Sequence, residues 1–192
     1  MALILGIYAS SQQASKITAF ASIATVTAAG GESTLSFTSI PSTFKHLQIR
    51  GIGRRTTGVG TNTGGITIQF NGDTATNYAY HNLSGTASGS ATAVGVITYA
   101  YMMAQGGTAL NGNAAGTFGT SIIDIADYAS TTKNKTIRSM SGTDVNAASA
   151  SIGISLNSGL WLSTAAITSI AVGQDSGLFA AGSTFALYGI KG

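Results

Sequence analysis

The sequence predicts an all-β protein: a single antiparallel β-sandwich, jelly-roll-like, with an extended N-terminal arm. Three observations lead to this fold class. From Ile23 onward, apolar and polar residues alternate with period two in many short runs, which is the pattern of half-buried strands. Glycine supplies 26 of the 192 residues and separates these runs. No window shows the sustained period of about 3.6 residues that marks a helix.

The length fits one domain, because a chain of 192 residues can bury a full hydrophobic core in a single fold. About nine or ten short strands with glycine-rich connections are typical of a two-layer sandwich. We place the arm at residues 1–21 and the sandwich at residues 22–192.

The alternation identifies the strands in order along the chain and predicts which side chains face the core. The expected apolar faces are Leu35 and Phe37; Leu47 and Ile49; Ile66, Ile68 and Phe70; Ile152, Ile154 and Leu156; Ile170 and Val172; and Phe185 and Leu187. Further strand candidates are Ala93–Tyr101, Ser121–Ala126 and Thr136–Met140.

Turn residues mark the connections. Asn71-Gly72 follows the run Ile66–Phe70 directly and predicts a β-hairpin with a type I′ turn. The pairs Gly64-Gly65 and Gly106-Gly107 indicate turns or loops. The glycine-, threonine- and asparagine-rich stretches 56–65, 84–92 and 106–119 are expected to be exposed loops, and 163–171 a strand or a short turn.

The composition excludes several classes of protein. Charged residues make up 8%, against about 25% in an ordinary soluble protein, and the net charge is +3. The basic residues are scattered, so no nucleic-acid partner is expected. No run of about 20 apolar residues exists, so no membrane partner is expected either. The absence of cysteine excludes disulfide scaffolds and thiolate metal sites. A neutral surface of this kind suits packing against protein neighbours.

The residues that carry chemistry are few, and we expect no catalytic, cofactor-binding or metal-binding site. His46 and His81 lack the local spacing of metal ligands. Asp124 and Asp127 lie three residues apart, which places them on opposite faces of a strand, and Asp127 is expected to close that strand near Lys133. A polysaccharide-degrading enzyme would need paired carboxylates from a total supply of six. Those six residues are Glu32, Asp73, Asp124, Asp127, Asp144 and Asp175.

The N-terminal segment Met1–Tyr8 is apolar and uncharged, and two interpretations stay open. It is either a first strand or loose terminus, or an arm that docks its apolar tip on a partner. Arg54-Arg55 is the only adjacent basic pair. The candidates for contact with a partner or a second copy are Leu3, Ile4, Leu5, Ile7, Tyr8, Arg54 and Arg55.

Several segments together resemble a group of virion proteins of tailed bacteriophages. These segments are Ser22–Thr27, Ser36–Arg50, Asp127-Tyr128, Lys133–Ser139, Ser158–Ile170 and Phe179–Ile190. The resemblance implies a non-enzymatic, jelly-roll-like module on the outer capsid surface. It implies a capsid decoration (cement) protein that clamps neighbouring copies of the major capsid protein and forms homo-oligomers, commonly trimers, with Met1–Phe20 as the anchoring arm.

A second interpretation places the chain in the phage tail or a fibre. The loops 56–65 and 84–92 would then contact the host surface, and Trp161 or a tyrosine would stack on a glycan. The more ordinary expectation for Trp161 is packing in the core or in an interface.

Overall fold

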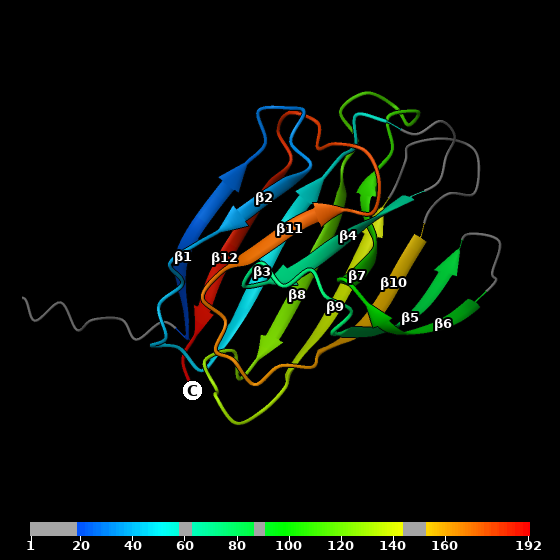
Figure 1. Ribbon diagram of the computed structural model, residues 1–192. Coiled ribbons are helices and arrows are strands. Elements are labelled where there is room, and N and C mark those ends of the chain that lie inside the picture. Colours follow the sequence, from blue (N-terminus) through cyan, green and yellow to red (C-terminus); the bar gives the residue numbers. More distant parts are fainter. Residues whose placement is uncertain (1–18, 58–62, 87–90, 144–152) are drawn as a thin grey trace, which may run out of the picture.

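The computed structural model describes residues 19–57, 63–86, 91–143 and 153–192, which form twelve strands and no helix (Figure 1). The larger sheet has eight strands in the order β1 (Phe20–Thr27), β12 (Thr184–Ile190), β3 (His46–Gly53), β8 (Gly119–Ala126), β9 (Lys135–Thr143), β10 (Gly153–Trp161), β5 (Tyr78–Thr86) and β6 (Ala91–Tyr99). The smaller sheet has four in the order β2 (Thr34–Phe37), β11 (Ile170–Gln174), β4 (Thr63–Phe70) and β7 (Met102–Ala109).

The two sheets pack face to face, and every strand pair within them is antiparallel. The all-β sandwich is therefore confirmed, while the jelly-roll-like connectivity stays a prediction. In Figure 1 the smaller sheet crosses one face of the larger one, and β5 and β6 lie beyond it on the right. The first strand begins at Phe20, so residues 20 and 21, assigned to the arm, belong to the sandwich.

The core lies between the sheets and is built from the alternating side chains that the sequence identifies. Leu47, Ile49, Ile66, Ile68, Phe70, Phe185 and Leu187 are all fully buried. Trp161 joins them at the end of β10, with its ring centroid 5.4 Å from that of Phe70. Its indole Nε1 donates a 2.7 Å hydrogen bond to Asp73 Oδ2, so the core position expected for Trp161 is confirmed.

The Asn71-Gly72 turn has the expected backbone but not the expected role. Both residues have positive φ, 53° and 69°, and Asp73 N donates to Phe70 O at 2.9 Å. The flanking strands do not pair with each other, because β4 belongs to the smaller sheet and β5 to the larger. The hairpin prediction is therefore wrong, and the turn carries the chain from one sheet to the other.

Two of the expected glycine turns are parts of strands. Gly64-Gly65 lies in β4, where the ladder with β7 shifts register, and Gly106-Gly107 lies in β7. Both are places of close approach: a Cβ on Gly107 would lie 2.6 Å from Ile66 Cδ1. The ends of the three expected loops consequently belong to β4, β5, β6, β7 and β8, while 58–62 and 87–90 lie outside the described residues.

We predict that the Asn71 turn is stabilised by its side chain as well as by its backbone. Asn71 Oδ1 accepts hydrogen bonds from Thr168 N at 2.8 Å and Ser169 N at 3.1 Å, and its Nδ2 donates to Ala166 O at 2.8 Å. Asn71→Gly loses these bonds but keeps the positive φ, so we expect a loss of about 1–2 kcal/mol in the free energy of unfolding.

Asn71→Ala loses the same bonds and also strains the backbone, so we expect about 1 kcal/mol more. Urea unfolding of the two variants measures this difference. Equal losses would show that the positive φ at position 71 has no energetic role.

Candidate interaction surface

One region of the larger sheet, which runs from Ile122 on β8 across β9 and β10 to Leu83 on β5, has reversed polarity. On β10, Ser155 and Asn157 are buried, at 4% and 3% exposure, whereas Ile154 and Leu156 are 58% and 48% exposed. The expectation that Ile154 and Leu156 face the core is therefore wrong, and Ile152 lies outside the described residues. The period of two is correct, but periodicity alone cannot tell which of the two faces is covered.

The covered side chains of this region are polar, and several of them are hydrogen-bonded to one another. Asn82 Nδ2 donates to Asn157 Oδ1 at 2.8 Å, and Asn157 Nδ2 donates to Ser139 Oγ at 3.0 Å. Thr143 Oγ1 donates to Gly106 O in β7 at 2.7 Å, which ties the layer to the smaller sheet. These bonds give the buried side chains of Asn82, Asn157, Ser139 and Thr143 the partners that buried polar groups require.

The uncovered face of the same region is apolar. We define the outer apolar patch as the six exposed large side chains Ile52, Leu83, Ile122, Met140, Ile154 and Leu156, which are 39–58% exposed. Ile122 is opposite Met140, Met140 is opposite Leu156, and Leu156 is opposite Leu83 in the strand registers. These four side chains therefore form one continuous row across four strands.

The patch is large for a single chain. Six aliphatic side chains about half exposed leave on the order of 500 Å² of apolar area, in the range of the largest patches on monomeric proteins, which are often functional. Two grooves open on it. One of about 360 Å³ is lined by Ile122, Met140 and Ile154, and one of about 590 Å³ by Leu83, Leu156 and Arg138 among others.

A polar row runs beside the patch on the same face. Gln48, Asp124 and Arg138 are opposite one another on β3, β8 and β9. Gln48 Nε2 donates to Asp124 Oδ1 at 2.7 Å, Arg138 Nη2 pairs with Asp124 Oδ2 at 2.9 Å, and Arg50 Nε donates to Gln48 Oε1 at 2.7 Å. An apolar surface with an ordered polar border is the usual anatomy of a protein–protein interface.

Arg54, named above as a contact candidate, is occupied inside the chain. Its side chain is buried, and its two terminal nitrogens donate to the carbonyl oxygens of Asn111, Asn113, Ala114 and Thr117 at 2.9–3.1 Å. The guanidinium therefore holds the loop between β7 and β8.

Arg55, the second basic candidate, is also buried. It forms an ion pair with Asp175 and donates to Ser176 Oγ at 2.8 Å, while Gly64 leaves the space that its guanidinium fills. Both arginines thus have partners within the fold, and their contact with a second protein stays a prediction. The other five candidates, Leu3, Ile4, Leu5, Ile7 and Tyr8, lie outside the described residues.

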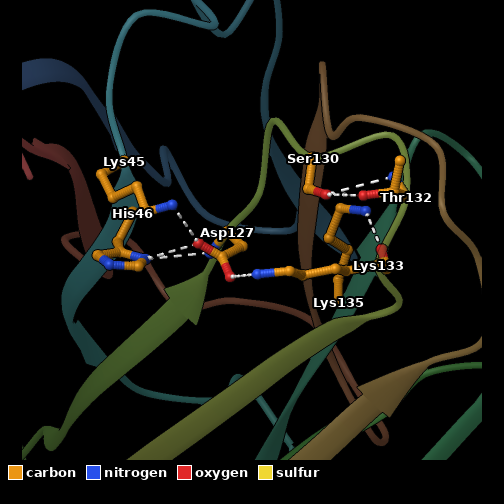
Figure 2. Close-up of polar contacts among 7 residues, drawn as sticks. All are labelled: Lys45, His46, Asp127, Ser130, Thr132, Lys133 and Lys135. Carbon is orange, nitrogen blue, oxygen red and sulfur yellow. Dashed lines mark hydrogen bonds and ion pairs between the residues drawn. The ribbon is translucent and has the colours of Figure 1, made fainter.

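A compact ionic cluster surrounds Asp127 at the end of β8 (Figure 2). Asp127 has a φ of 47°, and its carboxylate pairs with Lys45 Nζ and Lys133 Nζ, each at 3.0 Å. Its backbone N–H donates to His46 Nδ1 at 3.0 Å. Lys135, which is fully buried, donates instead to the carbonyl oxygens of Lys133 and Thr164. The expectation that Asp127 closes its strand near Lys133 is confirmed.

This cluster is suited to fastening the β8–β9 turn. Hydrogen bonds from Lys45 first, and then from Lys133, lower the pKa of Asp127 to about 2, so its carboxylate stays ionised. The adjoining pocket is only about 150 Å³, smaller than the usual ligand pocket. Within the described ranges, no group of three or more His, Asp or Glu side chains could hold a metal ion.

The chain matches no protein-family model, no curated protein and no solved structure. The described part of the chain contains no helix with the length and apolar character that a membrane crossing requires. The geometry of the outer apolar patch therefore carries the functional inference.

For two neighbouring residues of β10, we predict that truncating the polar side chain destabilises the fold more than truncating the apolar one. Asn157→Ala leaves Asn82 and Ser139 without their buried partner, so we expect a loss of about 1–3 kcal/mol in the free energy of unfolding. Leu156→Ala removes a half-exposed side chain, and we expect a loss of about 1 kcal/mol or less. Chemical unfolding of both variants tests the order, and a larger loss for Leu156→Ala would contradict the assignment of the two faces.

We predict that the Asp127 cluster makes the stability of the fold depend on pH below about pH 4. Because the folded-state pKa of Asp127 lies below its ordinary value of 3.8, its ion pairs stabilise the fold above about pH 4. That contribution is lost as the pH falls toward 2. Asp127→Asn keeps a residue that tolerates positive φ but cannot titrate, so the variant has a shallower loss of stability between pH 4 and pH 2. Melting temperatures measured across this interval for both proteins test it, and parallel curves would contradict it.

Proposed function

We propose that this chain is a structural protein of a bacteriophage virion, a capsid decoration protein that binds the outer capsid surface. The observation that carries the proposal is the outer apolar patch, which faces outward while the polar side chains of the same strands face inward. Aliphatic side chains in a row across four strands are stabilised when another protein covers them. The resemblance described above supplies the virion as the setting.

The chemistry of the patch favours a protein partner. The area of about 500 Å² approaches the roughly 800 Å² that each partner contributes to a standard interface. The bordering polar row contains two cations and one anion, Arg50, Arg138 and Asp124, which is too little positive charge for a phosphate backbone. The partner is the major capsid protein, and modest contacts made by many copies add up to a strong clamp.

The N-terminal segment completes the clamp. The residues that precede β1 include the apolar, uncharged run Leu3–Tyr8, which suits a tip buried in a neighbouring capsid subunit. β1, which follows this segment in the sequence, is an edge strand of the larger sheet. The arm and the patch thus contact the shell at separate points and link adjacent subunits.

A tail or fibre protein that contacts the host surface is the second candidate, and one observation favours it. Tyr80, Tyr99 and Tyr101 form an edge-to-face cluster with centroid separations of 5.8 and 4.7 Å, and Tyr99 is 36% exposed. Exposed tyrosine rings can stack on sugars. Trp161, by contrast, is buried and has no face available for a glycan.

We predict that charge on the patch abolishes capsid binding without unfolding the protein. In the variant Met140→Glu/Leu156→Glu, two carboxylates would be buried unpaired in the interface, so occupancy on capsids is expected to fall at least a hundredfold. The matched control is Leu162→Glu, an exposed leucine at 50% outside the patch, which should bind as the wild type does. Binding is measured by co-sedimentation with capsids that lack the protein.

Thermal unfolding of each variant serves as the control for folding. Truncation after residue 18, just before β1, tests the arm in the same assay. Wild-type occupancy of capsids by Met140→Glu/Leu156→Glu would contradict the proposal that the patch binds the capsid. Imaging of intact particles that locates the chain only on tails would favour the second candidate instead.

A further inference from the structure

The strand β6 is an unpaired edge without the usual protection. Among the described residues β5 is its only ladder partner, and its nine residues, Ala91–Tyr99, include no charged residue and no proline. It is exposed on both faces: Val94 at 52%, Ile97 at 72% and Tyr99 at 36%. A long, uncharged edge of this kind presents a row of backbone donors and acceptors to any strand that can align with it.

The other edges of the sandwich differ from β6. β2 is only four residues long, and the described side chains of β7 are mostly buried. β1 is preceded by the N-terminal segment and carries a register shift between Ser22 and Ala24. In β6 the register shift is confined to the end near Thr98, whose φ is 58°. The stretch Ala91–Val96 pairs with β5 without interruption and is regular enough to accept another strand.

We propose that β6 pairs antiparallel with β6 of a second copy of this chain about a two-fold axis. The two eight-stranded sheets would then form one continuous sheet. An isologous contact places each residue near its own counterpart, so a charged strand would repel itself. The lack of charge in β6 removes that penalty, which makes the strand complementary to itself.

The side chains of β6 also suit a copy of the same strand. Ala93 is opposite Leu83 and shares its outer face, and Gly95 is opposite His81 on that face. Ala93 is small, and the space above Gly95 holds the His81 ring, so no bulky side chain of β6 itself rises from this face at these two positions. On the other face, Val94 and Val96 are β-branched and pair well across antiparallel strands.

The pairing extends the outer apolar patch. Its row of Ile122, Met140, Leu156 and Leu83 ends at Ala93 on β6, so the rows of two copies would meet at the axis. Two patches side by side amount to on the order of 1,000 Å² of apolar area on one face. The pair is two-fold, unlike the trimer that the resemblance implies. It does not depend on the capsid proposal and is testable on the purified chain alone.

The first test is the mass of the full-length protein in solution over a concentration series, by sedimentation velocity. The wild type is expected to be a dimer that dissociates on dilution. Val94→Lys/Ile97→Lys places like charges across the axis, and we expect its dimer dissociation constant to rise at least tenfold. Leu162→Lys adds one cation at an exposed site outside β6 and should leave the dimer unchanged.

The second test uses disulfides, because the chain has no cysteine of its own. Single cysteines at Thr92, Ala93 and Val94 sample the centre of the regular stretch. Under mild oxidation we expect one of them to form a covalent dimer at least tenfold faster than Leu162→Cys, since only a residue near the axis meets its counterpart within disulfide distance.

Three outcomes would overturn the inference. One is a wild type that stays monomeric over the whole series. Another is a dimer or trimer whose dissociation constant is unchanged in Val94→Lys/Ile97→Lys. The third is association that is lost on truncation after residue 18, which would show that the N-terminal segment, and not β6, forms the contact between copies. None of these outcomes bears on capsid binding by the patch.

Discussion

The unequal width of the two sheets is the constraint on which the rest of the molecule depends. At about 4.8 Å per strand, eight strands span roughly 34 Å and four strands roughly 14 Å. The smaller sheet can cover only part of the larger one, and its strand β7 packs against β3, β8, β9, β10 and β5. The outermost strand, β6, has no comparable contact with the smaller sheet within the described residues, so both of its faces meet the surroundings.

The molecule meets this constraint by reversing polarity along the larger sheet. Near β3 the covered side chains are aliphatic, as at Leu47 and Ile49, and hydrophobic burial holds the layers together. At Asn157 on β10 and Ser139 on β9 the covered side chains are a hydrogen-bonded amide and hydroxyl, although Trp161 at the end of β10 belongs to the apolar core. The apolar residues of those strands are then free for a neighbour. In this region the uncharged polar residues thus face the interior, and the apolar residues of the same strands face outward.

Local features were predictable from the sequence, and pairing between distant segments was not. The alternation at Leu47 and Ile49 placed those side chains correctly, because β3 lies under the smaller sheet. The same rule failed at Ile154 and Leu156, because the covered face depends on which strands lie opposite. Asn71-Gly72 predicted the positive φ values, but it did not predict that the strand after the turn belongs to the other sheet. The outer apolar patch combines residues from five strands, so only the strand order brings them together.

Arg54 and Asp127 fasten opposite ends of the sandwich, because β3 and β8 run antiparallel and Arg54 follows the end of one as Asp127 follows the end of the other. The acceptors of Arg54 are carbonyl oxygens and one hydroxyl, none of which gains a proton in acid. Asp127 is a carboxylate and does. Acidification therefore weakens the contacts of Asp127 while the hydrogen bonds of Arg54 persist, and at the Arg54 end the acid-sensitive contact is the neighbouring Arg55–Asp175 ion pair.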